Sequence, residues 1–120
     1  MAVANKLRAG QIVWAAVRDR NGFRKTRPVI ILTPNDEIGI DQPLVVMAVT
    51  TTYPDPVPKD YIELPWNPDA RRVSTGLSRR SAAVITWLDT AYADEVMEVI
   101  GTVPTKTMNN IRERLAKLLP

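Results

Sequence analysis

Short apolar runs follow one another along this chain with almost no helical sequence between them, and this order constrains the fold more than any other feature. Each run is four to eight residues long and rich in β-branched residues, as expected of buried strands. Parallel strands need crossover connections of about a dozen residues or more, so the pattern favours antiparallel pairing. The predicted strands cover residues 12–18, 28–32, 44–51, 61–64, 81–88 and 97–103.

Turn-forming residues separate these runs. The pair Asn21-Gly22 readily adopts positive φ, so residues 19–22 are expected to form a hairpin loop. Three of the ten prolines fall between residues 53 and 59, which makes that segment irregular. Polar loops are expected over residues 33–42 and 65–74, and one short helical turn over residues 90–95.

The last segment carries the clearest helical pattern. Met108, Ile111, Leu115 and Leu118 recur at spacings of three and four residues, which places one apolar stripe on a helix over residues 105–119. We therefore predict a mainly β fold, a small and strongly bent antiparallel barrel with a C-terminal α-helix. A chain of 120 residues has the size of a single domain, which we expect to cover residues 1–120.

The chain contains no cysteine and no histidine, and this excludes several classes of chemistry. Disulfides, thiol nucleophiles, Ser-His-Asp triads and imidazole or thiolate metal sites are all ruled out. The glycines form no phosphate-binding loop and the acidic residues lack the spacing of a calcium loop, so we expect no metal and no cofactor. No run approaches the roughly 18 apolar residues of a membrane helix, and residues 1–10 lack the apolar segment of a signal peptide. We therefore expect a cytoplasmic protein that does not bind membranes.

The net charge of +3 is unevenly distributed. Residues 1–30 carry seven basic residues and one acidic residue, whereas residues 31–70 carry seven acidic residues and one basic residue. Basic residues cluster over 18–27 and again over 71–80. If the fold brings the two clusters together, they form a positive surface suited to phosphate. For each cluster alone, an ordinary solvated face is the favoured interpretation, because runs of charge usually serve only to solvate the surface.

Arg27 and Thr50 are the strongest candidates for a functional site. Pro28 favours an extended backbone at Arg27, which we expect to lie at the rim of the barrel where its strand begins. The next strand ends in three threonines, so antiparallel pairing would bring Thr50 to the same end of the sheet. A guanidinium and a hydroxyl that converge in this way can bind a phosphate. The simpler alternative is a surface arginine and a threonine present for its β-propensity.

Tryptophan side chains can stack on nucleic-acid bases, but they are more often core or interface residues. We expect the core or interface role for Trp14 and Trp87. Trp66 lies in the loop sequence ELPWNP and is expected to be exposed.

Six segments taken in order form a recognisable set. They read GQIVWAAV (10–17), KTRPVIILT (25–33), LVVMAVTTT (44–52), YIELPW (61–66), TGLSRRSAAV (75–84) and IGTVPTKTMNNIRERLAKLL (100–119). In this order they resemble the PemK/MazF family of bacterial toxin–antitoxin ribonucleases. The resemblance covers nearly all of the chain, from about Gly10 onward.

The resemblance implies an SH3-like barrel with a C-terminal helix, usually a homodimer, that cleaves single-stranded RNA without a metal. The 2′-hydroxyl would attack the adjacent phosphate and leave a 2′,3′-cyclic phosphate and a 5′-hydroxyl. The family's essential arginine matches Arg27, and its essential threonine best matches Thr50. A cognate antitoxin protein would bind the same groove through an acidic or apolar tail, and the basic hairpin over residues 19–25 is expected to move on binding. The RNA-binding residues expected beside the catalytic pair are Arg20, Arg24, Lys25, Thr51, Arg79, Arg80 and Ser81.

The segment after Ser81 departs from the family pattern. Many members carry Glu/Gln-Ile-Arg-Thr there, whereas this chain reads Thr86-Trp87-Leu88-Asp89-Thr90. This departure leaves two other hypotheses open. One is a non-catalytic barrel that binds nucleic acid or a protein peptide, and the other is a structural barrel within a larger assembly.

Overall fold

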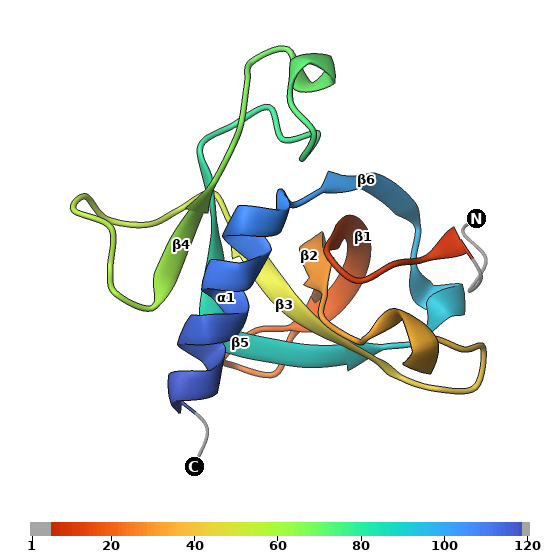
Figure 1. The fold of residues 1–120 in the computed structure, drawn as a ribbon. Coiled ribbons are helices and arrows are strands. Elements are labelled where there is room, and N and C mark those ends of the chain that lie inside the picture. Colours follow the sequence, from red (N-terminus) through yellow and green to blue (C-terminus); the bar gives the residue numbers. More distant parts are fainter. Residues whose placement is uncertain (1–5, 119–120) are drawn as a thin grey trace.

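The computed structural model describes residues 6–118, which form a six-stranded antiparallel sheet followed by one long helix (Figure 1). The predicted mainly β, SH3-like barrel class with a C-terminal helix is confirmed. The predicted last helical residue, Leu119, and residues 1–5 lie outside the described residues. The elements are β1 (Gln11–Arg18), β2 (Arg24–Ile31), β3 (Leu44–Thr50), β4 (Tyr61–Leu64), β5 (Ser81–Ala91), β6 (Glu98–Thr102) and α1 (Thr105–Leu118).

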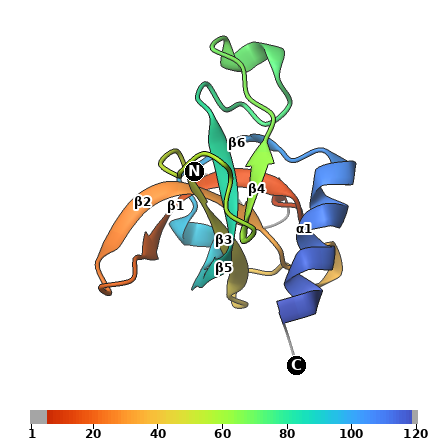
Figure 2. The same ribbon diagram turned by 90° about the vertical axis from the view of Figure 1, so that its left-hand side faces the viewer.

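The strands lie in the order β4-β5-β3-β2-β1-β6, and every neighbouring pair is antiparallel, as predicted. The register shifts between Met47 and Val49 where β3 meets β5, and between Ile12 and Val13 where β1 meets β6. Such irregularities bend strands and increase their twist. The sheet is accordingly strongly curved, with α1 packed beside it (Figure 2).

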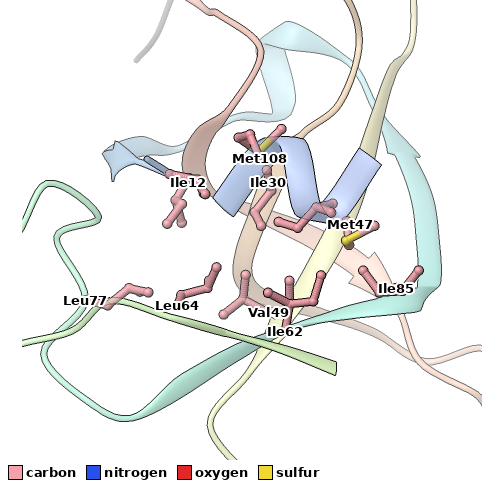
Figure 3. Close-up of a cluster of buried hydrophobic side chains, with 12 residues drawn as sticks. Ile12, Ile30, Met47, Val49, Ile62, Leu64, Leu77, Ile85 and Met108 are labelled. Carbon is pink, nitrogen blue, oxygen red and sulfur yellow. The ribbon is translucent and has the colours of Figure 1, made fainter. Parts of the chain in front are cut away.

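Two apolar clusters hold this curved sheet together, one on each side. The first contains Ile12, Ile30, Met47 and Ile85, and it is covered by Met108 and Ile111 of α1 (Figure 3). The second includes Val13, Val29 and Val46, which follow or precede first-cluster residues along the same strands. Because side chains alternate between the two faces of a strand, burial on both sides explains why these runs are continuously apolar.

The helical stripe is confirmed over most of its length. Met108 and Ile111 are buried, and Leu115 packs against the first cluster. The prediction is wrong for Leu118, whose side chain is 51% exposed. Leu118 instead lines a shallow hollow together with Ile85 and Thr86 of β5. Within residues 6–118, no helix is both long and apolar enough to cross a membrane.

The hairpin between β1 and β2 differs from the prediction. β2 begins at Arg24 rather than at residue 28, because Arg24 pairs with Arg18 and Arg27 pairs with Ala15. Arg27 is therefore the fourth residue of its strand and does not mark the beginning of it. The loop is confined to residues 19–23, where the Asp19 carboxylate accepts hydrogen bonds from the backbone N–H groups of Asn21 and Phe23. Lys25, expected in a mobile loop, belongs to the strand.

The loop between β4 and β5 is held against β6 by a close backbone approach. Gly76 has a φ of +68°, and a Cβ there would collide with the carbonyl oxygen of Ile100. A Cβ at Gly101 would likewise collide with Thr75. The Thr102 N–H donates to the carbonyl of Ser74 at 2.8 Å, and this bond fixes the loop on the edge strand. The loop thus becomes one wall of the pocket described below.

Candidate functional site

Arg27 and Thr50 lie near the same end of two neighbouring strands, β2 and β3. β2 and β3 pair Val29 with Ala48 and Ile31 with Val46. Continued toward the end of the sheet, the same antiparallel register sets Arg27 across from Thr50. Side chains opposite one another in such a pair have Cβ atoms about 4.5–5.5 Å apart. The fold therefore brings the guanidinium-bearing and hydroxyl-bearing residues together at one end of the sheet.

Both residues line one pocket with a volume of about 580 Å³. The β4–β5 loop contributes Gly76, Leu77, Ser78 and Arg79, and β6 contributes Ile100. The pocket has no carboxylate among its described lining residues. It has three cationic side chains, those of Lys25, Arg27 and Arg79. It also has six hydroxyl groups, those of Thr26, Thr50, Thr51, Thr52, Ser78 and Ser81. This composition is suited to a phosphate group, which needs opposite charge and many hydrogen-bond donors.

The guanidinium of Arg27 has no acidic partner within residues 6–118. Its Nε atom is buried and makes no hydrogen bond to any described residue. Its Cζ atom lies 4.5 Å from the centre of the Trp87 ring, which is a cation–π distance. Arg27 is therefore held by an aromatic face and does not have its charge neutralised by a carboxylate.

Thr50 ends β3, and its hydroxyl is engaged locally. Oγ1 donates to the carbonyl of Thr52 at 3.2 Å and accepts from the Thr52 N–H at 3.1 Å. A hydroxyl can rotate and exchange a weak donor contact for a stronger anionic acceptor. Thr51 and Thr52 follow the strand, are exposed and line the same pocket. Of the three threonines, Thr50 is the one that an extension of the β2–β3 register places across from Arg27.

The predicted RNA-binding residues divide into two groups. Lys25, Thr51, Arg79 and Ser81 line the pocket, although Ser81 is buried and its Oγ donates to the carbonyl of Arg79 at 2.8 Å. The other three predicted residues, Arg20, Arg24 and Arg80, are not pocket-lining residues.

Ion pairs hold two of those three arginines outside the pocket. Arg24 forms an ion pair with Glu95 at 3.2 Å, and Arg80 forms one with Glu63 at 3.1 Å. Arg20 lines a different hollow together with Asp19. Among the described residues, Lys25 and Arg27 of the first predicted basic cluster and Arg79 of the second line the same pocket.

A second polar cluster adjoins the end of β3 and involves Tyr53. The Tyr53 hydroxyl donates to Glu63 Oε2 at 2.9 Å, and the Arg80 guanidinium lies 4.1 Å above the Tyr53 ring. Burial and the hydrogen bond to Glu63 raise the pKa of Tyr53 to about 12. This phenol is therefore protonated at neutral pH and does not act as a base there.

Asp89, in the segment that departs from the family pattern, ties β5 to the end of β1. Its carboxylate accepts a hydrogen bond from the Arg18 N–H at 2.8 Å and lies 3.5 Å from the Arg18 guanidinium. Burial raises the pKa of Asp89, whereas the hydrogen bonds from the backbone N–H groups of Arg18 and Thr90 lower it. The hydrogen bonds have the larger combined effect, so the pKa of Asp89 is below its ordinary value. Asp89 is therefore ionised at neutral pH.

Sequence reasoning missed some of the residues that shape this site. Thr26 and Ser78 add hydroxyls to the pocket, and Trp87, expected to be a core or interface residue, contacts Arg27. Trp14 is half-buried and lines the pocket, while Trp66 is 45% exposed, as predicted. No sequence signal marks the contact between Trp87 and Arg27, because it joins two strands, β5 and β2, that are not neighbours in the sheet. Within the described residues, no group of three or more acidic side chains is placed to hold a metal ion.

Comparisons with known proteins agree with this architecture. The family model described as "PemK-like, MazF-like toxin of type II toxin-antitoxin system" matches residues 8–119. No curated protein sequence shows significant similarity to the chain.

Solved structures show the same fold. The fold is similar to that of an endoribonuclease in complex with its cognate antitoxin from a mycobacterial species, with 22% identity, a TM-score of 0.69 and coverage of 95% of this chain and 97% of that chain. It is also similar to MazF (Form-I) from Deinococcus radiodurans, with 18% identity, a TM-score of 0.71 and coverage of 93% and 94%.

Proposed function

The chain belongs to the PemK-like, MazF-like toxin family of type II toxin–antitoxin systems, and from this premise we propose that it is a metal-independent endoribonuclease that cleaves single-stranded RNA. One observation carries the proposal. Arg27, with no acidic partner among the described residues, and Thr50 line one pocket that no described carboxylate lines. Such a pocket attracts a phosphodiester, and the guanidinium of Arg27 is available to bind it.

In the proposed reaction the 2′-hydroxyl of one nucleotide attacks the phosphorus of the adjacent phosphodiester. A new 2′-oxygen–phosphorus bond forms, the bond to the 5′-oxygen breaks, and the 2′-hydroxyl proton is lost as the leaving 5′-oxygen gains one. The products are a 2′,3′-cyclic phosphate and a 5′-hydroxyl. Arg27 would neutralise the charge that develops on the non-bridging oxygens, and Thr50 would donate a hydrogen bond to one of them.

Charge stabilisation and in-line positioning supply most of the rate in this proposal. The chain has no histidine, and the Tyr53 phenol remains protonated at neutral pH. Lys25, Thr51 and Arg79 would hold neighbouring parts of the RNA backbone within the pocket. Arg20, Arg24 and Arg80 would contact RNA outside the pocket, where Arg24 and Arg80 would first have to release their glutamates.

The proposal includes an inhibitor and a second copy of the chain. One structural relative is an endoribonuclease in complex with its cognate antitoxin. We infer that a cognate antitoxin binds this protein through an acidic or apolar segment that occupies the pocket and so competes with RNA. We also infer that the protein is a homodimer and acts in the cytoplasm, where its RNA substrate is found.

The test is cleavage of a long single-stranded RNA by purified protein in the presence of EDTA. We expect discrete fragments from the wild type and none from Arg27→Ala. Arg71→Ala is the matched control, because Arg71 is an exposed arginine outside the pocket that pairs with Asp69. RNA that stays intact under every condition, with binding retained, would overturn the nuclease and favour the non-catalytic binding module.

A further inference from the structure

Trp87 is the only described residue for which the structure shows a specific contact with the guanidinium of Arg27. An arginine can be oriented by the hydrogen bonds that its N–H groups donate to a carboxylate. Here the Arg27 Nε is buried without a partner, and the Cζ atom lies 4.5 Å from the centre of the Trp87 ring. The orientation of the most important cation of the pocket therefore depends on an aromatic ring.

The Trp87 ring is itself fixed by contacts to another strand. Its Nε1–H donates to the carbonyl of Arg18 at 2.8 Å, at the end of β1. Two residues further along β5, the Asp89 carboxylate accepts from the N–H of the same Arg18 at 2.8 Å. These two bonds tie β5 to β1 through the N–H and the carbonyl of one residue, and the bond from Nε1 restrains rotation of the indole. Arg27 on β2 then packs on a ring that is held from β1 and β5.

An arginine held by an aromatic ring keeps its charge and its hydrogen-bond donors, whereas an arginine held by a carboxylate does not. A carboxylate accepts the guanidinium N–H donors in pairs and neutralises the charge. A ring face attracts the cation through its quadrupole and does not compete for the in-plane donors. A guanidinium held by Trp87 is therefore oriented while its charge and its terminal N–H groups stay free for a phosphate.

We propose that Trp87 is a positioning residue that orients Arg27 for catalysis by a cation–π contact. The inference rests on the proposed ribonuclease function. An unanchored arginine would sample several rotamers and be correctly placed for part of the time only. Cation–π contacts of this kind are worth enough to change a rate by roughly 2- to 30-fold, so we expect a loss of about 10-fold when the ring is removed.

Kinetics on a defined single-stranded RNA in EDTA test this role with three substitutions. Trp87→Leu and Trp87→Met remove the ring, whereas Trp87→Phe keeps an aromatic face but loses the bond to Arg18. We expect both aliphatic variants to lower kcat about 10-fold with a much smaller change in KM, and Trp87→Phe to stay within about 3-fold of wild type. Trp66→Leu, which changes an exposed tryptophan outside the pocket, is the matched control and should leave kcat unchanged.

A second readout does not depend on RNA. The Hε resonance of Arg27 should be shifted upfield by the ring current of Trp87 in the wild type and in Trp87→Phe, and should lose that shift in both aliphatic variants. Thermal unfolding identifies any variant that fails to fold, and the flexible methionine side chain offers a second way to fill part of the space if the leucine variant does not fold.

The possible outcomes separate the two proposals. A wild-type protein that cleaves RNA, with Trp87→Leu and Trp87→Met folded and equally fast, would overturn the role of Trp87 alone. So would an Arg27 resonance that is unchanged without the ring. A wild-type protein that cleaves no RNA would overturn the proposed function, and this inference with it.

Discussion

Replacing Thr50 with valine removes the hydroxyl from the proposed catalytic pair and keeps the shape of the side chain. The hydroxyl contacts only the backbone of Thr52, through bonds of 3.2 and 3.1 Å in exposed surroundings where water can replace them. Losing such bonds costs about 1 kcal/mol, and valine suits a strand as well as threonine does. Tm should therefore fall by only a few degrees.

The expected effect on cleavage is much larger. If Thr50 donates to a non-bridging oxygen in the transition state, its loss should slow the reaction by about 10²–10³, as removal of an oxyanion donor does. The assay is single-turnover cleavage of a defined RNA, which excludes product release from the measured rate. Thr90→Val is the matched control, because Thr90 is an exposed strand threonine outside the pocket. It should cleave at the wild-type rate.

A folded Thr50→Val protein that cleaves within about 3-fold of wild type would refute the reasoning, since it would show that the hydroxyl does not touch the reacting phosphate. An equal loss in Thr90→Val would refute it as well. The effect would then belong to the sheet as a whole and not to the pocket.

Three further predictions follow from other parts of the structure. Lys25→Ala and Arg79→Ala should each reduce the steepness of the plot of log affinity against log salt concentration for single-stranded RNA by about 0.7. The control, Arg71→Ala, should leave this slope unchanged. Equal slopes in all variants would mean that the pocket does not bind phosphates. Because hydrogen bonds lower the pKa of Asp89 below 3.8, its contribution to stability is present above that value and is lost as pH falls through the lower folded pKa. Chemical denaturation between pH 7 and pH 2 should therefore show an acid-dependent loss in the wild type that is reduced in Asp89→Asn, and identical profiles would contradict this assignment. Gly76→Ala should lower the free energy of unfolding by about 1–3 kcal/mol, because the added Cβ would collide with Ile100 and the φ of Gly76 is positive. Gly39→Ala is the control and should have little effect, because its Cβ would make only an ordinary van der Waals contact. A Gly76→Ala protein as stable as wild type would show that the loop is not held at this position.

Most of the fold could be predicted from the sequence because buried residues form recognisable apolar patterns along the chain. Continuous apolar runs such as Val29–Ile31 identify strands that are buried on both faces, and the stripe of Met108 and Ile111 identifies the packed face of α1. The boundaries of β2 could not be predicted in this way. Residues 24–26 are polar and exposed, so they resemble a loop, and their strand conformation comes from backbone pairing with β1, which leaves no pattern in the side chains.

The candidate site was predictable to the extent that it depends on two adjacent strands. Arg27 and Thr50 each stand near the end of an apolar run, so antiparallel pairing was enough to bring them together. The partners of the other arginines were not predictable. Arg24 meets Glu95 across 71 residues of sequence, and Trp87 reaches Arg27 from a strand that is not adjacent to β2. Both contacts depend on the curvature of the sheet, which the pattern of apolar residues does not specify.

The most direct measurement of the central claim uses an RNA in which one nucleotide at a mapped cleavage site carries a 2′-deoxy sugar. If Arg27 and Thr50 stabilise the attack of the 2′-hydroxyl on its own phosphate, the modified RNA should bind with nearly unchanged affinity and resist cleavage at that site. The unmodified RNA should yield 2′,3′-cyclic phosphate ends in EDTA. Cleavage at the deoxy position, or fragments with 5′-phosphate ends, would contradict the account.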